Sequence, residues 1–126
     1  MIALKTNNLV KKFNGFAAVD GISLSVPAGA IYGFLGPNGA GKTTTLKMLV
    51  GMTEATSGTI EIFGEKVERG SLLKRSDIGF LPDVPGFYDW MNAIEFLDFC
   101  GTLYKLNKNE RTKRIKELLV LVGLEK

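Results

Sequence analysis

The chain has 126 residues, of which 45% are apolar and only four are proline, and this composition is typical of one packed domain or part of one. Sixteen lysines and arginines against thirteen acidic residues give a net charge of +3, which is too small to indicate a nucleic-acid partner by itself. The single cysteine excludes an internal disulfide, and the short apolar runs indicate neither a membrane span nor a signal peptide, so we expect a cytoplasmic protein.

Three strands and a helix are predicted in the first part of the chain. Residues 3 to 10 form one strand, and residues 22 to 26 form another, because apolar side chains there alternate with serines. Ile31 to Leu35 is apolar without alternation, which is typical of a strand covered on both faces in a parallel sheet. Lys42 to Val50 is compatible with a helix and ends at Gly51, where a helix cap belongs.

Two further strands are predicted after this helix. Thr59 to Phe63 alternates as a short strand and follows a turn at residues 57 and 58. Asp77 to Leu81 is a second apolar run, and it reads as another buried strand that Pro82 ends. The first part of the chain and these two segments together predict a fold of the α/β class.

Two helices are predicted in the last third of the sequence. Asn92 and Asn107 each fit the N-cap position, and each is followed three residues later by a glutamate that can bond back to the cap. Gly123 ends the second helix. Six basic residues between Lys105 and Lys116 face one acid, and their spacing fits the solvated face of that helix, with nucleic-acid binding as the alternative.

A glycine-rich loop connects the apolar run at residues 31 to 35 with the helix at residues 42 to 50. It matches the spacing G-x-x-x-x-G-K-[ST] between a buried strand and a helix, which is the context of a phosphate-binding loop. Glycines let consecutive N–H groups turn inward around phosphate oxygens, and the helix dipole adds positive potential. The predicted nucleotide-binding residues are Gly36, Pro37, Asn38, Gly39, Ala40, Gly41, Lys42, Thr43 and Thr44.

Three polar side chains at the start of the helix complete this predicted site. We expect Lys42 to reach the β and γ phosphates as a mobile charge, and Thr43 to coordinate a Mg²⁺ ion that bridges them. Thr44 is expected to bond on the side of the α phosphate. The sequence therefore predicts that the chain binds ATP together with Mg²⁺.

The loop and its surroundings resemble the ATP-binding-cassette (ABC) ATPases, the motor domains of ABC transporters. Leu35 to Thr44 has that family's form of the loop, and Thr56 to Ile60 with Phe63 and Gly64 resembles its antiparallel β-region. The resemblance implies an α/β fold, with an incomplete P-loop NTPase sheet, an antiparallel β-subdomain and the start of a helical subdomain.

A second part of the resemblance concerns the base of the nucleotide. Lys11-Lys12-Phe13, followed by Ala18 to Ser23, is similar to the family segment whose aromatic side chain stacks on adenine. The resemblance carries this stacking role to Phe13, with Val19 as an apolar neighbour. Because an aromatic face accepts any base without reading its edges, we expect only a weak preference for adenine.

A third part concerns the segment after the second apolar run. Ile78 to Pro82 resembles the approach to the family's Q-loop, where a glutamine contacts Mg²⁺ and relays the nucleotide state to the membrane subunit. Asp83 stands at that position and keeps the metal role, but a carboxylate cannot donate a hydrogen bond, which leaves the relay role open. Pro85 to Met91 is rich in aromatic residues, which indicate either packing under the next helix or a docking surface for a transmembrane partner.

Other motifs of the family do not occur in the sequence. It has no LSGGQ-like signature, no strand ending in Asp-Glu and no histidine. We therefore interpret residues 1–126 as the N-terminal part of an ABC-type nucleotide-binding domain, with no catalytic residue among them. ATP hydrolysis is expected of the complete protein, and this part alone is expected to be inactive.

The resemblance implies an ATPase subunit that couples ATP hydrolysis to transport. The partners that it implies are a transmembrane transporter subunit and a second ABC ATPase domain in a dimer, with no nucleic acid. The expected location is cytoplasmic and peripheral, at the inner face of the cell membrane through the transmembrane partner. Two alternatives stay open: a soluble ABC protein that acts on nucleic acid or ribosomes, and a nucleotide-binding fragment without turnover.

Overall fold

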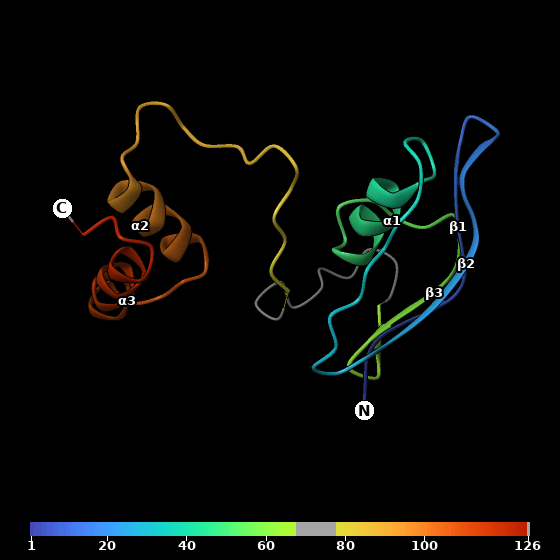
Figure 1. Cartoon of the computed structure of the whole chain (residues 1–126), viewed down its shortest axis with the longest axis horizontal. Helices are drawn as coiled ribbons and strands as arrows, with labels where there is room; N and C mark the ends of the chain where they lie inside the picture. Colours follow the sequence, from blue (N-terminus) through green and yellow to red (C-terminus); the bar gives the residue numbers. More distant parts are fainter. Residues whose placement is uncertain (68–77, 126) are drawn as a thin grey trace. The chain divides into compact units, whose positions relative to one another are not determined.

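The computed structural model describes residues 1–67 and 78–125 and divides the chain into two compact units (Figure 1). Unit 1 comprises Met1–Phe80 and carries the sheet and the first helix, whereas unit 2 comprises Leu81–Lys126 and carries two helices. None of the helices in the described ranges is long and apolar enough to cross a membrane.

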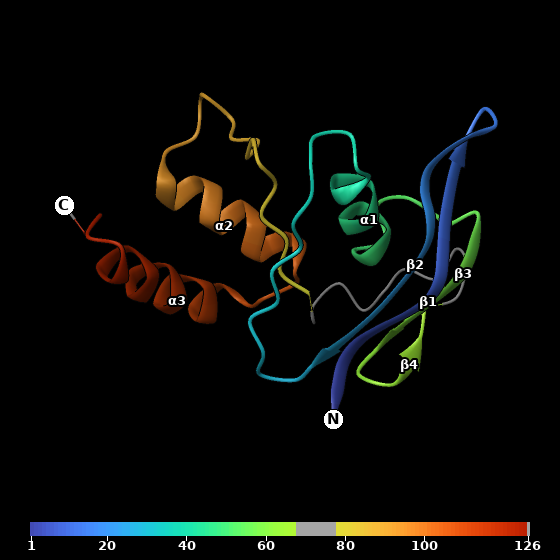
Figure 2. The same ribbon diagram turned by 45° about the vertical axis from the view of Figure 1, so that its right-hand side comes forward.

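A long antiparallel hairpin forms the base of unit 1 (Figure 2). Strand β1 (Ile2–Phe13) pairs with strand β2 (Phe16–Pro27) across a two-residue turn of Asn14 and Gly15, whose φ angles are 47° and 85°. Positive φ at both turn positions gives a twist that matches the paired strands, and glycine adopts it without steric cost. Both strands exceed their predicted ranges because this tight turn lets the pairing continue to the tip.

Two shorter strands complete a four-stranded antiparallel sheet in the order β2-β1-β3-β4. Strand β3 (Ser57–Ile62) pairs with β1, and strand β4 (Glu65–Lys66) pairs with β3. The strand predicted at residues 59 to 63 is therefore present, although Phe63 belongs to the following turn. The predicted antiparallel β-region is confirmed.

The core of unit 1 lies between this sheet and helix α1 (Lys42–Leu49). Met48 and Leu49 of the helix pack with Leu9, Val19 and Ile60 of the three longest strands. Leu9 and Met48 are 0% and 1% exposed, so this small cluster excludes water almost completely. Because the hydrophobic effect acts on buried apolar area, these contacts fix the helix on the sheet.

The strands predicted at residues 31 to 35 and 77 to 81 are not found, and this part of the prediction is wrong for the described residues. No regular structure is present at residues 31–37 or 78–82, Ile31 is fully exposed, and Leu35 is 93% exposed. A parallel strand satisfies its backbone groups only by pairing with neighbours, and no described strand lies alongside either segment. Asp77 itself lies outside the described residues.

Unit 2 is a pair of helices, α2 (Ala93–Leu103) and α3 (Lys108–Leu121), and both begin at the predicted caps. The side-chain oxygen of Asn92 accepts from the N–H of Glu95 at 3.0 Å, and the Glu95 carboxylate accepts from the N–H of Asn92 at 2.9 Å. Asn107 accepts from the N–H of Glu110 at 2.9 Å, whereas its own side-chain amide donates to that carboxylate at 3.1 Å. Gly123 follows the end of α3 with a φ angle of 72°, as predicted.

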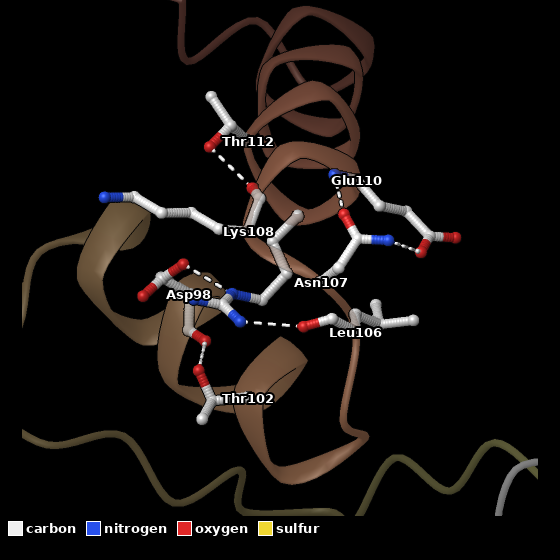
Figure 3. A network of polar contacts seen from close by, with 8 residues as sticks. Asp98, Thr102, Leu106, Asn107, Lys108, Glu110 and Thr112 are labelled. Carbon is white, nitrogen blue, oxygen red and sulfur yellow. Dashed lines mark hydrogen bonds and ion pairs between the residues drawn. The ribbon is translucent and has the colours of Figure 1, made fainter.

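An ion pair joins the two helices of unit 2 (Figure 3). The Arg111 guanidinium donates to the Asp98 carboxylate at 2.7 Å and to the carbonyl oxygen of Leu106 at 2.8 Å. Arg111 was predicted to lie on the solvated face of α3, but its side chain is only 16% exposed. The prediction is wrong for this residue because a carboxylate of the neighbouring helix faces it.

Met48→Ala is expected to lower the free energy of unfolding by about 2–5 kcal/mol, because it leaves a cavity in the core of unit 1. Leu46→Ala is the matched control, since Leu46 lies in the same helix and is 41% exposed. Its expected effect is below about 1 kcal/mol. Urea denaturation of both variants measures the difference, and equal losses would contradict the core described here.

Candidate phosphate-binding site

The backbone at the start of α1 has free hydrogen-bond donors. Gly41 is the N-cap residue and provides no side-chain cap, and no acidic residue lies in the first turn. Within the described part of the chain, no hydrogen bond uses the N–H groups of Gly41, Lys42, Thr43 or Thr44. Unpaired N–H groups and the positive end of the helix dipole together favour an anion at this position.

The position of Gly41 is fixed by strand β2. Lys11 pairs with Val19 and Lys12 pairs with Ala17, so Ala18 is an extra residue in β2 and forms a β-bulge. A side chain at position 41 would clash with the carbonyl oxygen of Ala18 and would approach Val19 Cγ2 to 3.1 Å. Gly41 also has a φ angle of 83°, so only glycine combines this backbone conformation with this close approach.

The ammonium group of Lys42 lies against the loop. Its Nζ atom donates to the carbonyl oxygen of Gly36 at 2.5 Å and to that of Pro37 at 2.7 Å. Gly39, between these carbonyls and the helix, has a φ angle of 84°. The loop therefore folds around a positive charge, and the contact of Lys42 with phosphates stays a prediction.

Thr45 contributes to the site, although it was not predicted from the sequence. Its side chain is 0% exposed, and its hydroxyl donates to the carbonyl oxygen of Gly41 at 2.9 Å, beside the backbone bond from its own N–H at 2.8 Å. Both bonds hold this carbonyl toward the helix, so the adjoining N–H of Lys42 points the opposite way. The available signal was a threonine four residues after the last loop glycine, a spacing at which hydroxyls bond back along a helix.

Two other threonines, Thr43 and Thr44, lie in the first turn of α1. Thr43 is exposed and Thr44 is partly exposed. In the described ranges the Thr43 hydroxyl takes part in no hydrogen bond, so it is accessible to a ligand. Hydroxyl, phosphate and water oxygens are ligands that Mg²⁺ prefers, and the donor at Thr43 fits this chemistry.

The predicted base-stacking residue lies at the tip of the hairpin. Phe13 is the last residue of β1, pairs with Phe16, and is 49% exposed. Figures 1 and 2 both place this tip at the same end of unit 1 as the phosphate loop. Val19 is only 2% exposed and belongs to the core, where its side chain lies next to Gly41. About half of Phe13 and almost none of Val19 is therefore accessible to solvent, and a base contact of either residue stays a prediction.

Asp83 and the aromatic segment belong to unit 2. Asp83 is exposed in a loop, and its role as a metal ligand stays a prediction. No group of three or more His, Cys, Asp or Glu in the part of the chain described could hold a metal ion.

The aromatic segment packs against helix α2, as one of the two interpretations predicted. Phe87 contacts Phe96 with ring centroids 5.2 Å apart, and Tyr88 contacts Phe99 at 5.8 Å. Trp90 lies 5.0 Å from Tyr88 and is 75% exposed. These rings pack on α2 and also keep much of their surface in solvent.

Comparisons with known proteins agree with this geometry. Residues 19–126 match the family model for ABC transporters. The chain is 46% identical over 121 residues to the uncharacterized ABC transporter ATP-binding protein YxlF of Bacillus subtilis (strain 168), covering 96% of this chain and 39% of that protein. It is 43% identical over 124 residues to the bacitracin transport ATP-binding protein BcrA of Bacillus licheniformis, covering 97% of this chain and 39% of that protein.

A solved structure extends the agreement to the fold. The ATP binding subunit of an ABC transporter matches with a TM-score of 0.81 and 28% identity, over 98% of this chain and 51% of that chain. The predicted fold class, α/β of the P-loop type, is thereby confirmed. The chain spans about two fifths of the length of the curated relatives named above.

Gly41→Ala is expected to weaken Mg-ATP binding by about tenfold or more, because the new methyl group strains the backbone and displaces the loop from β2. Gly86→Ala is the control, since Gly86 has open space around it and no positive φ angle. Isothermal titration calorimetry of both variants measures the affinities. Equal affinities of the two variants would show that the close approach of Gly41 to Ala18 does not matter for binding.

Proposed function

The chain belongs to the ABC transporter family of ATP-binding proteins, and we propose that it binds Mg-ATP as the nucleotide-binding part of a transporter's ATPase subunit. The observation that carries this proposal is the geometry of the loop. Gly41 lies close to the carbonyl oxygen of Ala18, and the Lys42 ammonium donates to two carbonyl oxygens of the loop. The relatives BcrA and YxlF, whose names describe ATP-binding proteins of transport systems, support it.

Phosphate binding follows from the free donors at the start of α1. The N–H groups of residues 41 to 44 take up phosphate oxygens, and Lys42 exchanges two carbonyl partners for phosphate oxygens. The Lys42 ammonium exchanges neutral carbonyl oxygens for negatively charged phosphate oxygens, and the attraction between opposite charges favours the phosphate. The bond from Thr45 to Gly41 keeps the donors in position before the ligand arrives.

Mg²⁺, when bound, would neutralise part of the negative charge of the phosphates. We propose Thr43 as one oxygen ligand, because its hydroxyl is exposed on the first turn of α1. Asp83 is proposed as a further oxygen ligand, which its position after Pro82 and its carboxylate chemistry support. Phe13 is proposed to stack on the base, and stacking on one aromatic face predicts only a weak preference for adenine.

We propose that the complete protein hydrolyses ATP and that residues 1–126 alone do not. The loop positions phosphates and compensates their charge, but it holds no carboxylate or histidine to orient a water molecule. We assign that task to parts of the complete protein beyond these residues and to a second ABC domain in a dimer. An enzyme loses nearly all activity when the groups that act together in phosphoryl transfer are removed.

A transmembrane transporter subunit is the proposed partner, and this places the protein at the inner face of the membrane. The exposed rings of the segment at residues 85 to 91 support a docking role, since Phe87 is 66% and Trp90 is 75% exposed. The alternative of a nucleic-acid partner is less well supported. Two of the basic residues of α3 are already paired, Arg111 with Asp98 and Arg114 with Glu117.

Lys42→Ala is expected to weaken Mg-ATP binding by about tenfold or more, because a charge-assisted contact to the phosphates is lost. Lys47→Ala is the control, since Lys47 is an exposed lysine of the same helix. Titrations with Mg-ATP and Mg-GTP, after a check of folding by circular dichroism, should give similar affinities for the two nucleotides. If Lys42→Ala binds as tightly as Lys47→Ala, the phosphate-loop proposal is wrong.

Asp83→Ala is expected to make nucleotide binding less dependent on Mg²⁺ than it is in the wild type. The reason is that a carboxylate oxygen is lost from the coordination of the ion. Asp89→Ala serves as the control, because Asp89 is another exposed acid of the same segment. The measurement is ATP affinity as a function of Mg²⁺ concentration, and an unchanged dependence would remove Asp83 from the metal site.

A further inference from the structure

Lys11 makes two contacts that none of the roles described so far explains. Its Nζ atom donates to the carbonyl oxygen of Glu54 at 2.7 Å. The same atom lies 4.9 Å from the centroid of the Phe13 ring, within the range of a cation–π interaction. Lys11 and Phe13 are two residues apart in β1, so both side chains leave the same face of the strand.

These contacts restrict a side chain that is otherwise flexible. A lysine has four rotatable carbon bonds and gains little from an exposed contact unless something else holds its charge. The carbonyl of Glu54, in the connection between α1 and β3, provides that anchor. The ammonium is therefore held against one face of the ring, and Phe13 still keeps 49% of its surface in solvent.

The ring has a fixed relation to the phosphate loop. Phe13 pairs with Phe16, and Ala18, which contacts Gly41, lies two residues further along β2. Two residues of a strand correspond to about 7 Å, so Phe16, the partner of Phe13, lies within about one nucleotide's length of Ala18. Because the turn between Phe13 and Phe16 has only two residues, the ring cannot move far from the strand.

We propose that Lys11 is a positioning residue for the base of the nucleotide. Its ammonium, anchored on the Glu54 carbonyl, covers one face of Phe13 and presents the other face to the base. This inference rests on the proposed function, and specifically on stacking by Phe13. A preorganised ring loses less conformational entropy on binding, and this raises the affinity for ligands that carry a base.

A purely structural role of Lys11 predicts a different result. In that case the bond to Glu54 only holds the connection after α1 against β1, and its loss affects every ligand of unit 1 equally. The two roles are separated by comparing ATP with inorganic triphosphate, which has the phosphates but no base. The ratio of the two affinities reports on the base contact alone.

The experiment measures the affinity of the purified protein for Mg-ATP and for inorganic triphosphate with Mg²⁺. Lys11→Met keeps an unbranched side chain of nearly the same length and removes its charge, whereas Lys11→Arg keeps a cation that can stack and donate. We expect Lys11→Met to weaken ATP binding by about two- to fivefold, the size of an exposed cation–π contact, and to leave triphosphate binding unchanged. Lys11→Arg should behave as the wild type, and Lys11→Met should have no further effect in a Phe13→Ala background.

Three results would overturn the inference. These are equal weakening of both ligands by Lys11→Met, no weakening of ATP binding, or a full additional loss in the Phe13→Ala background. Phe13→Ala alone separates this inference from the proposed function. If Phe13→Ala leaves the affinity ratio unchanged while Lys42→Ala weakens both ligands, base stacking is wrong and the role of Lys11 falls with it. If Phe13→Ala lowers the ratio and Lys11→Met does not, only the role of Lys11 is wrong.

Discussion

The close approach of Gly41 to the carbonyl oxygen of Ala18 is the constraint on which the phosphate site depends. It places the start of α1 directly on strand β2, so the loop ends at a defined point of the sheet. The approach is possible because Ala18 is the extra residue of a β-bulge, which redirects a strand locally. The hydrophobic cluster around Met48 then holds the other end of the helix, and together these contacts fix the direction of the helix dipole.

The site is built at the expense of helix stability. A serine, threonine or aspartate at the N-cap would stabilise α1 by only about a few tenths of a kcal/mol relative to glycine, and its side chain would occupy the N–H groups that a phosphate needs. Gly41 leaves these groups free, and the hydroxyl of Thr45 bonds from inside the helix, where it does not block the ligand. The Lys42 ammonium donates to two carbonyl oxygens of the loop, and these bonds hold its positive charge at the site without a competing carboxylate.

The parts of this protein that could be predicted from sequence are those with local causes. The glycine-rich loop before α1, the capping box at Asn92, the N-cap at Asn107 and the glycine ends of helices each depend on residues a few positions apart. The strand at residues 31 to 35 could not be judged in this way, because a parallel strand exists only if distant segments pair with it. Arg111 was misplaced for the same reason, since the carboxylate of Asp98 that turns it inward lies on another helix.

Register explains why the contacts of Phe13 and Val19 were only partly predictable. Side chains of a strand alternate between its faces, so one inserted residue moves those beyond it to the opposite face. The bulge at Ala18 is such an insertion in β2, and Val19 beyond it enters the core next to Gly41, whereas Phe13 lies in β1 at the exposed tip of the hairpin. No local pattern shows on which side of the bulge each residue falls. In the proposed function β1 thus carries Phe13, which stacks on the base, and β2 carries Ala18, which positions the phosphate loop. The bulge sets the register between the two strands.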